Sequence, residues 1–162
     1  LGVGPKRLEL PRAFGGAAAF PAHDVRVFSP GRLVVGAPAW RGPDADEAAL
    51  ASRVAQDPAF AGWPLLVLSD EPARAARSAM NFLWTTFTRF EPARDIHAAA
   101  SRVVANHVAL KGPIVIDART KPWYPKELSA DDATSRLVSD RWREYFPDGG
   151  VEMGDSERGH LD

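Results

Sequence analysis

Two groups of charged residues in the sequence could take part in chemistry. The first follows a short apolar run, Ile114–Ile116, and consists of Asp117, Arg119 and Lys121. A carboxylate beside cations at the end of a buried strand stands where open α/β sheets bind ligands. The same spacing suits an ion pair that fixes the exit from the strand. Because no nucleophile accompanies these residues, the sequence favours the ion pair.

The second group lies in a turn and consists of Arg89, Glu91, Arg94 and Asp95, with Pro92 between them. A carboxylate between guanidinium groups can accept paired hydrogen bonds and lock such a turn. The turn could also receive an acidic group of a partner. The sequence favours a rigid turn or a contact between subunits over a ligand site.

Other catalytic chemistry has little support in the residue types. The chain contains no cysteine, which excludes a thiolate nucleophile, a disulfide and a zinc–cysteine site. Its four histidines show no metal-ligand spacing, and no Gly-x-Ser-x-Gly motif or phosphate-binding loop is present. A free nucleotide-binding domain is therefore a weak third alternative to the two functions given below.

Length, charge and hydropathy place further limits on the function. The 162 residues suit one domain with a real core, and the formal net charge of −1 gives no case for binding nucleic acid or an anionic membrane. No apolar stretch approaches a membrane span and no signal peptide is visible, so we expect a cytoplasmic protein. The chain starts at Leu1 rather than Met, which indicates trimming or a piece of something longer.

Apolar patterning predicts the strands and helices that position these groups. Val25–Phe28 and Leu33–Gly36 flank a Pro-Gly turn and predict a hairpin. Two short apolar runs, Leu65–Leu68 and Ile114–Ile116, predict strands covered on both faces. The expected helices are a first ending near Gln56, a second running from Asp70 towards Thr88, a third covering part of Ile96–Val108, and a fourth over Asp131–Phe146.

This alternation of strands and helices predicts an α/β fold. We expect a single-layer, mostly parallel sheet flanked by helices, with an antiparallel hairpin at one edge. The α/β domain is expected over residues 1–146. Residues 147–162 are rich in glycine and charge and are expected to form a mobile tail.

Three stretches resemble the carboxy-terminal domain of the UbiD family, decarboxylases and carboxylases that use prenylated FMN. They are Leu65–Asp70, Phe82–Ile96 with its Thr-Arg-x-x-Pro-x-x-Asp turn, and Ile114–Pro122 with its Ile-Asp-Ala-x-x-Lys-Pro exit. The resemblance extends in order over roughly residues 25–125. The chain departs from the family in two ways. The acidic cluster is reduced to Asp70 and Glu71, and the domain that precedes this one in the family is missing from the chain.

The resemblance implies where the cofactors belong. In the family, prenylated FMN, a divalent metal such as manganese and the Glu-Arg-Glu catalytic set sit on a central split-barrel domain. No stretch of this chain could be that domain. We therefore expect no catalytic, cofactor-binding or metal residue here, no turnover by this chain alone, and a partner domain or chain that carries the flavin and the metal.

The function implied is that of a carboxy-terminal lobe or small subunit of a UbiD-like enzyme acting on aromatic or unsaturated acids. Such a lobe would shape and close the active site of the flavin-bearing partner and contribute to oligomerisation. The alternative is a non-catalytic assembly subunit, since aromatic residues on the last helix could anchor a partner. The residues expected to line the substrate or an interface are Trp84, Phe87, Arg89, Asp117, Lys121, Trp123, Trp142 and Tyr145.

Overall fold

The computed structural model describes residues 9–16, 22–42, 45–127 and 130–149. Its strands are β1 (Val25–Ser29), β2 (Arg32–Gly36), β3 (Leu65–Ser69), β4 (Ile96–Val104) and β5 (His107–Asp117). Its helices are α1 (Ala45–Gln56), the 3-10 turn η1 (Pro58–Phe60), α2 (Pro72–Ala75), α3 (Ala79–Thr88), α4 (Asp132–Asp140) and α5 (Trp142–Tyr145). The chain divides into two compact units, residues 1–122 and 123–162, and each is described by itself.

The first unit is built on a five-stranded sheet in the order β1-β2-β3-β5-β4. The three middle strands are parallel, whereas β1 pairs with β2 and β4 pairs with β5 in antiparallel fashion. The predicted α/β fold and the edge hairpin β1–β2 are confirmed. The expectation of a mostly parallel sheet is too broad, because the sheet is parallel only in its middle.

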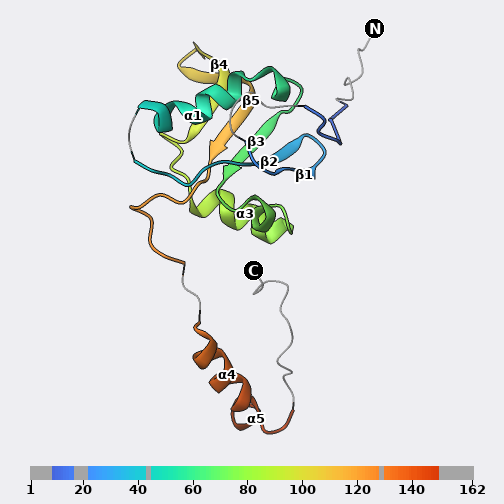
Figure 1. The fold of residues 1–162 in the computed structure, drawn as a ribbon, viewed down its shortest axis with the longest axis vertical. Coiled ribbons are helices and arrows are strands. Elements are labelled where there is room, and N and C mark those ends of the chain that lie inside the picture. Colours follow the sequence, from blue (N-terminus) through green and yellow to red (C-terminus); the bar gives the residue numbers. More distant parts are fainter. Residues whose placement is uncertain (1–8, 17–21, 43–44, 128–129, 150–162) are drawn as a thin grey trace. The chain divides into compact units, whose positions relative to one another are not determined.

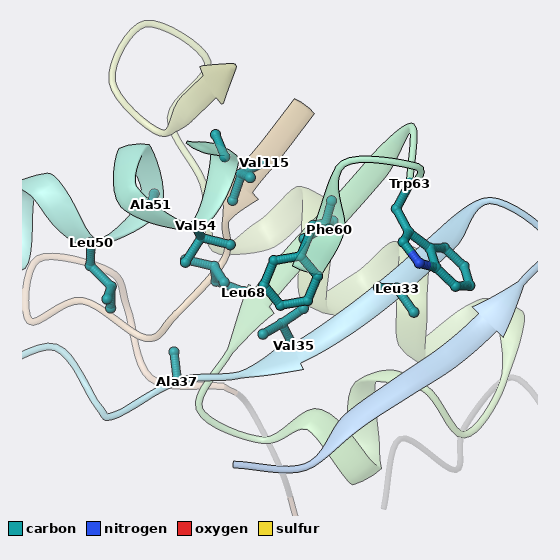
Figure 2. Packing of buried hydrophobic residues seen from close by; sticks show 12 residues of the cluster. Leu33, Val35, Ala37, Leu50, Ala51, Val54, Phe60, Trp63, Leu68 and Val115 are labelled. Carbon is teal, nitrogen blue, oxygen red and sulfur yellow. The ribbon is translucent and has the colours of Figure 1, made fainter. Parts of the chain in front are cut away.

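Helices cover both faces of this sheet, with α1 and α3 on opposite sides (Figure 1). Alternate side chains of each middle strand supply the two cores, as the strand period of two requires. On the α1 face Leu33, Val35 and Leu68 pack with Val54 and Phe60, and Figure 2 shows this cluster. On the other face lies a smaller cluster of Val34, Val67, Ala75, Phe82 and Ala118.

The predicted helix within Ile96–Val108 is wrong. The segment forms β4, a tight turn and the start of β5, paired from Ile96 with Ile116 to Val104 with His107. Ala105 and Asn106 make the turn with positive φ angles of 47° and 64°, the geometry of a two-residue hairpin loop. The helical tendency of the alanines in this segment yields to cross-strand pairing with the buried strand.

Two other predicted helices are interrupted. The helix expected from Asp70 is split into α2 and α3, because Ser78 turns extended and caps α3 by accepting a hydrogen bond from the Asn81 backbone N–H at 3.1 Å. The last helix likewise breaks at Arg141 into α4 and α5. The compact units meet after Pro122, and the expected boundary of the α/β domain at residue 146 stays a prediction. The expected tail begins at residue 147, and its residues 150–162 lie outside the described part.

Gly36 allows the segment before β1 to approach the end of β2. A Cβ atom added there would lie 2.0 Å from the His23 carbonyl oxygen and 2.9 Å from Cγ of Pro72. The His23 carbonyl oxygen is a backbone atom, so it cannot move away from such a contact as the end of a flexible side chain could.

We expect Gly36→Ala to lower the free energy of unfolding by about 1–3 kcal/mol, as overpacking does. Gly62→Ala is the matched control, since a Cβ there meets nothing within 4 Å. Urea unfolding followed by circular dichroism measures both variants. Equal stability of the two would contradict the close approach.

Candidate functional site

A cluster of buried charges lies at the carboxyl ends of the middle strands. Asp117 ends β5, and both of its carboxylate oxygens accept from the guanidinium of Arg119, at 2.9 Å from Nε and 2.8 Å from Nη2. The Arg119 side chain is fully buried. Its Nη1 donates to the Pro38 carbonyl at 3.2 Å, and its guanidinium stacks over the Trp40 ring at 5.2 Å. Arg119 therefore ties the exit of β5 to the loop after β2.

Lys121 is the second buried cation of the cluster. Its ammonium group donates to the Asp117 carbonyl at 2.6 Å, to Oδ2 of Asp95 at 3.0 Å and to the Arg89 carbonyl at 3.1 Å. These three acceptors match the three hydrogens of an ammonium group. Lys121 thus holds together the end of α3, the turn before β4 and the exit of β5.

The turn before β4 is fixed from within as well. Oδ2 of Asp95 accepts from the Glu91 backbone N–H at 2.7 Å, and the Asp95 carbonyl accepts from the Asp117 N–H at 2.9 Å. Arg94 lies 3.7 Å from Glu91, but both side chains are about half exposed, so this pair contributes little. The two charged groups that the sequence shows separately are joined by the Lys121–Asp95 ion pair.

Arg89 extends the cluster to the end of β3. Its Nη1 lies 2.8 Å from a carboxylate oxygen of Glu71 and 3.4 Å from Oδ1 of Asp70. Asp70 in turn accepts from the Thr120 backbone N–H at 3.3 Å. The sequence did not indicate Asp70, Pro38 or Trp40 as partners, although the rule that parallel strands end at one edge could have pointed to Asp70.

The cluster positions backbone and offers no metal site. The described residues hold no group of three or more histidine, aspartate or glutamate side chains able to bind a metal. Asp117 and Asp95 are committed to Arg119 and Lys121, so the residues present do not fit a divalent metal. The geometry supports the ion-pair interpretation that the sequence favoured.

We expect Lys121→Met to lower the free energy of unfolding by about 3–5 kcal/mol, because it leaves the buried Asp95 carboxylate without its cation. Lys126→Met is the matched control, since that exposed side chain makes no part of the cluster, and its effect should stay within about 0.5 kcal/mol. Chemical denaturation measures both. A loss below about 1 kcal/mol for Lys121→Met would contradict the role given to the ammonium group.

A histidine lies next to this cluster on β4. The half-buried His97 ring forms a hydrogen bond through Nδ1 with the Ser52 hydroxyl of α1, at 3.0 Å. Burial lowers the pKa of His97 below its usual 6.5, with Asp117 and Asp95 opposing the shift and Lys121 adding to it. The neutral ring therefore joins α1 to the edge strand.

This shift makes stability depend on pH. Below pH 6.5 the unfolded chain binds a proton at His97 that the folded chain resists, so the free energy of unfolding should fall as pH falls from 6.5 towards the lowered pKa. His97→Gln should flatten that slope. His107→Gln, at an exposed position, is the control and should keep it. Denaturation curves at several pH values decide, and an unchanged slope in His97→Gln would refute the assignment.

A second feature is the apolar outer face of α3. Met80, Leu83, Trp84 and Phe87 follow helical spacing and are 39%, 50%, 41% and 60% exposed. No residue of α3 is charged. Because Lys121 and Arg89 fix the end of this helix, the face is presented in a set orientation.

The other predicted site residues belong to the second unit. Trp123 is 47% exposed, and its ring lies 6.2 Å from that of Tyr124. Trp142 packs on Phe146 at 4.6 Å, and Tyr145 is 48% exposed with Arg141 over its ring. The described side chains of α4 and α5 include no buried one. Roles for these residues as substrate wall or interface stay predictions.

Comparison with known proteins gives sequence relatives in Chlamydia. The chain is 35% identical over 151 residues to a Chlamydia pneumoniae protein that is named as a subunit of 4-hydroxybenzoate decarboxylase. The chain is thus similar to a decarboxylase subunit. It is also 38% identical over 147 residues to an uncharacterized protein of Chlamydia trachomatis serovar D. Each match covers 91% of this chain and 24% of the relative, so the chain spans about a quarter of the length of these relatives.

Two further comparisons add little. No protein-family profile matches the chain. The vanillic acid decarboxylase of Sedimentibacter hydroxybenzoicus in its open form superimposes with a TM-score of 0.41 and 16% identity, over 74% of this chain and 28% of that one.

Among the described residues, no helix has the length and apolar character needed to span a bilayer.

Proposed function

We propose that this chain is a lobe or small subunit of a UbiD-like decarboxylase that shapes and closes the active site of a flavin-bearing partner domain or chain. The observation that carries the proposal is the 35% identity to the Chlamydia pneumoniae decarboxylase subunit, over nearly the whole of this chain. It agrees with the resemblance of the Thr-Arg-x-x-Pro turn and the Asp-Ala-x-x-Lys-Pro exit to the UbiD family.

The outer face of α3 is the surface suited to this role. Its aromatic and aliphatic side chains can line a substrate pocket and exclude water from it once the lobe contacts its partner. The absence of charge on α3 fits contact with an aromatic or unsaturated acid at its apolar end. The buried ion pairs of Lys121 and Arg119 fix the loops beneath, so the face closes as one rigid surface.

In this proposal the partner carries the catalytic centre and this chain shapes the active site. Prenylated FMN supplies the reactive centre, and we place it with a manganese-like divalent metal on the partner. This chain contributes shape: it orients the substrate ring and keeps solvent out. An aromatic acid such as 4-hydroxybenzoate is the first substrate to test.

The purified chain alone should be colourless and should release no CO₂ from 4-hydroxybenzoate. Visible absorbance spectra and a CO₂-release assay check both expectations. Flavin absorbance that co-purifies with this chain in the absence of any partner would overturn the division of labour. Co-expression with the larger polypeptide should give a complex that is coloured and active.

In that complex, Trp84→Ala and Phe87→Ala should lower kcat/KM about tenfold or more, because a displaced wall misplaces the substrate. Trp84 is 41% exposed and Phe87 is 60% exposed, so both variants should stay folded, which circular dichroism checks. Leu137→Ala on α4 is the control for a similarly exposed apolar residue. Full activity of both α3 variants would refute the role of this face.

A second candidate function is a non-catalytic assembly subunit. It is favoured by α4 and α5, whose Leu137, Val138 and Tyr145 are exposed, as is Phe146 directly after α5. Helices this short are marginal without a docking surface. Affinity purification separates the two candidates. The proposed function requires a flavin-bearing UbiD-like chain among the bound proteins, whereas the assembly function requires an unrelated complex whose capture is lost in Leu137→Lys.

A further inference from the structure

The hairpin of β4 and β5 extends beyond the rest of the sheet. Strand β3 pairs only with Ile114–Asp117 of β5, so the segment from His107 to Lys111 pairs with β4 alone. Figure 1 shows this hairpin at the upper edge of the sheet. We call Ala100–Lys111 the ribbon. Because no further strand of the described sheet flanks it, nearly all of its residues are exposed.

One face of the ribbon carries two cations beside two small residues. Directly paired residues of antiparallel strands share a face, and residues two apart along a strand share it as well. The register pairs Arg102 with Ala109 and Lys111 with Ala100. The two cations are therefore diagonal neighbours, with backbones about 7–8 Å apart. The alanines occupy the other diagonal, and because their side chains end at Cβ they leave space between the two longer side chains.

A hollow of about 360 Å³ lies at this place on the ribbon. It is lined by Ala100, Ser101, Arg102, Ala109, Leu110 and Lys111. Its volume falls at the lower end of the range found for small-molecule sites. The hollow can therefore admit one small charged group together with part of the molecule that carries it.

The positive charge around the hollow has no counterion within the described part of the chain. The side chains of Arg102 and Lys111 form no ion pair with any described residue. The sequence between Asp95 and Asp117 contains no aspartate or glutamate. Like charges within reach of each other across a strand pair repel, and an anion bound between them would remove that repulsion.

We propose that the hollow on the ribbon binds a phosphate group, carried by a soluble phosphate ester or by a lipid headgroup. Two cations match the charge of about −1.5 to −2 on a phosphate monoester, whereas a carboxylate would neutralise only one of them. The Arg102 guanidinium can donate paired hydrogen bonds to two phosphate oxygens, and the Lys111 ammonium group adds a compact charge. The site shares no residue with the outer face of α3, so it is independent of the proposed function.

Titration of the full chain with inorganic phosphate at constant ionic strength, followed by proton–nitrogen NMR, tests the site. The shifts should saturate with a Kd of about 1 mM or tighter and should be confined to backbone amides of the ribbon. Arg102→Gln and Lys111→Gln should each weaken binding at least about tenfold, because each removes a charge-assisted hydrogen-bond donor. Arg143→Gln and Lys126→Gln remove the same charges from exposed positions outside the ribbon and should leave the Kd unchanged.

A variant that fills the hollow separates a shaped site from general attraction to positive charge. Ala109→Leu leaves the charge unchanged and should weaken phosphate binding at least about tenfold. Val103→Leu, on the opposite face of the ribbon, is its control and should bind as the unmodified chain does. Circular dichroism checks that both variants are folded. Shifts that do not saturate, equal shifts with chloride at the same ionic strength, or full binding by Ala109→Leu would each overturn the proposal.

Vesicles distinguish the two sources of the phosphate group. Phosphatidylcholine vesicles that contain phosphatidic acid present a phosphate monoester on a bilayer, and vesicles with phosphatidylserine at equal surface charge are the control. Co-sedimentation with the phosphatidic acid vesicles alone, lost in Lys111→Gln, assigns the site to a lipid headgroup. Saturable binding of phosphate without co-sedimentation assigns it to a soluble phosphate ester. Equal co-sedimentation with both kinds of vesicle overturns the proposal, because binding would then follow surface charge and not the phosphate group.

Discussion

The position of the loops at one edge of the sheet depends on the buried ammonium group of Lys121. It meets a carbonyl from the end of α3, a carboxylate from the turn before β4 and a carbonyl at the end of β5. Removing two charges from water is costly, and only complete hydrogen bonding offsets that cost. Arg119 repeats the arrangement with Asp117, so two adjacent cations organise the backbone of three strand ends.

This arrangement explains why a charged cluster at a typical ligand-binding edge need not bind a ligand. Each buried cation of the cluster meets protein acceptors, and the Asp117 carboxylate is taken up by Arg119. What the edge offers a partner is the orientation of α3 and its exposed aromatic face.

The sequence predicted the middle strands because Leu65–Leu68 and Ile114–Ile116 are apolar throughout, as strands covered on both faces require. It predicted the ion pair from the local spacing of Asp117 and Arg119. It missed the partners Asp70 and Trp40, which topology brings in from distant segments. The sequence also predicted a helix over part of Ile96–Val108, because its alanines favour helices. The segment forms a strand because it pairs with β5, and such pairing cannot be read from local preference.

The Arg119 guanidinium donates a hydrogen bond to the carbonyl of Pro38, which lies 81 residues earlier in the chain, and this has a kinetic consequence. Such a contact cannot form until the parallel strands β2, β3 and β5 have paired, and parallel pairing across long connections is slow. Interactions that appear after the barrier has been crossed leave the folding rate nearly unchanged and slow the reverse step. The buried guanidinium group therefore governs how long the native state lasts, more than how quickly it is reached.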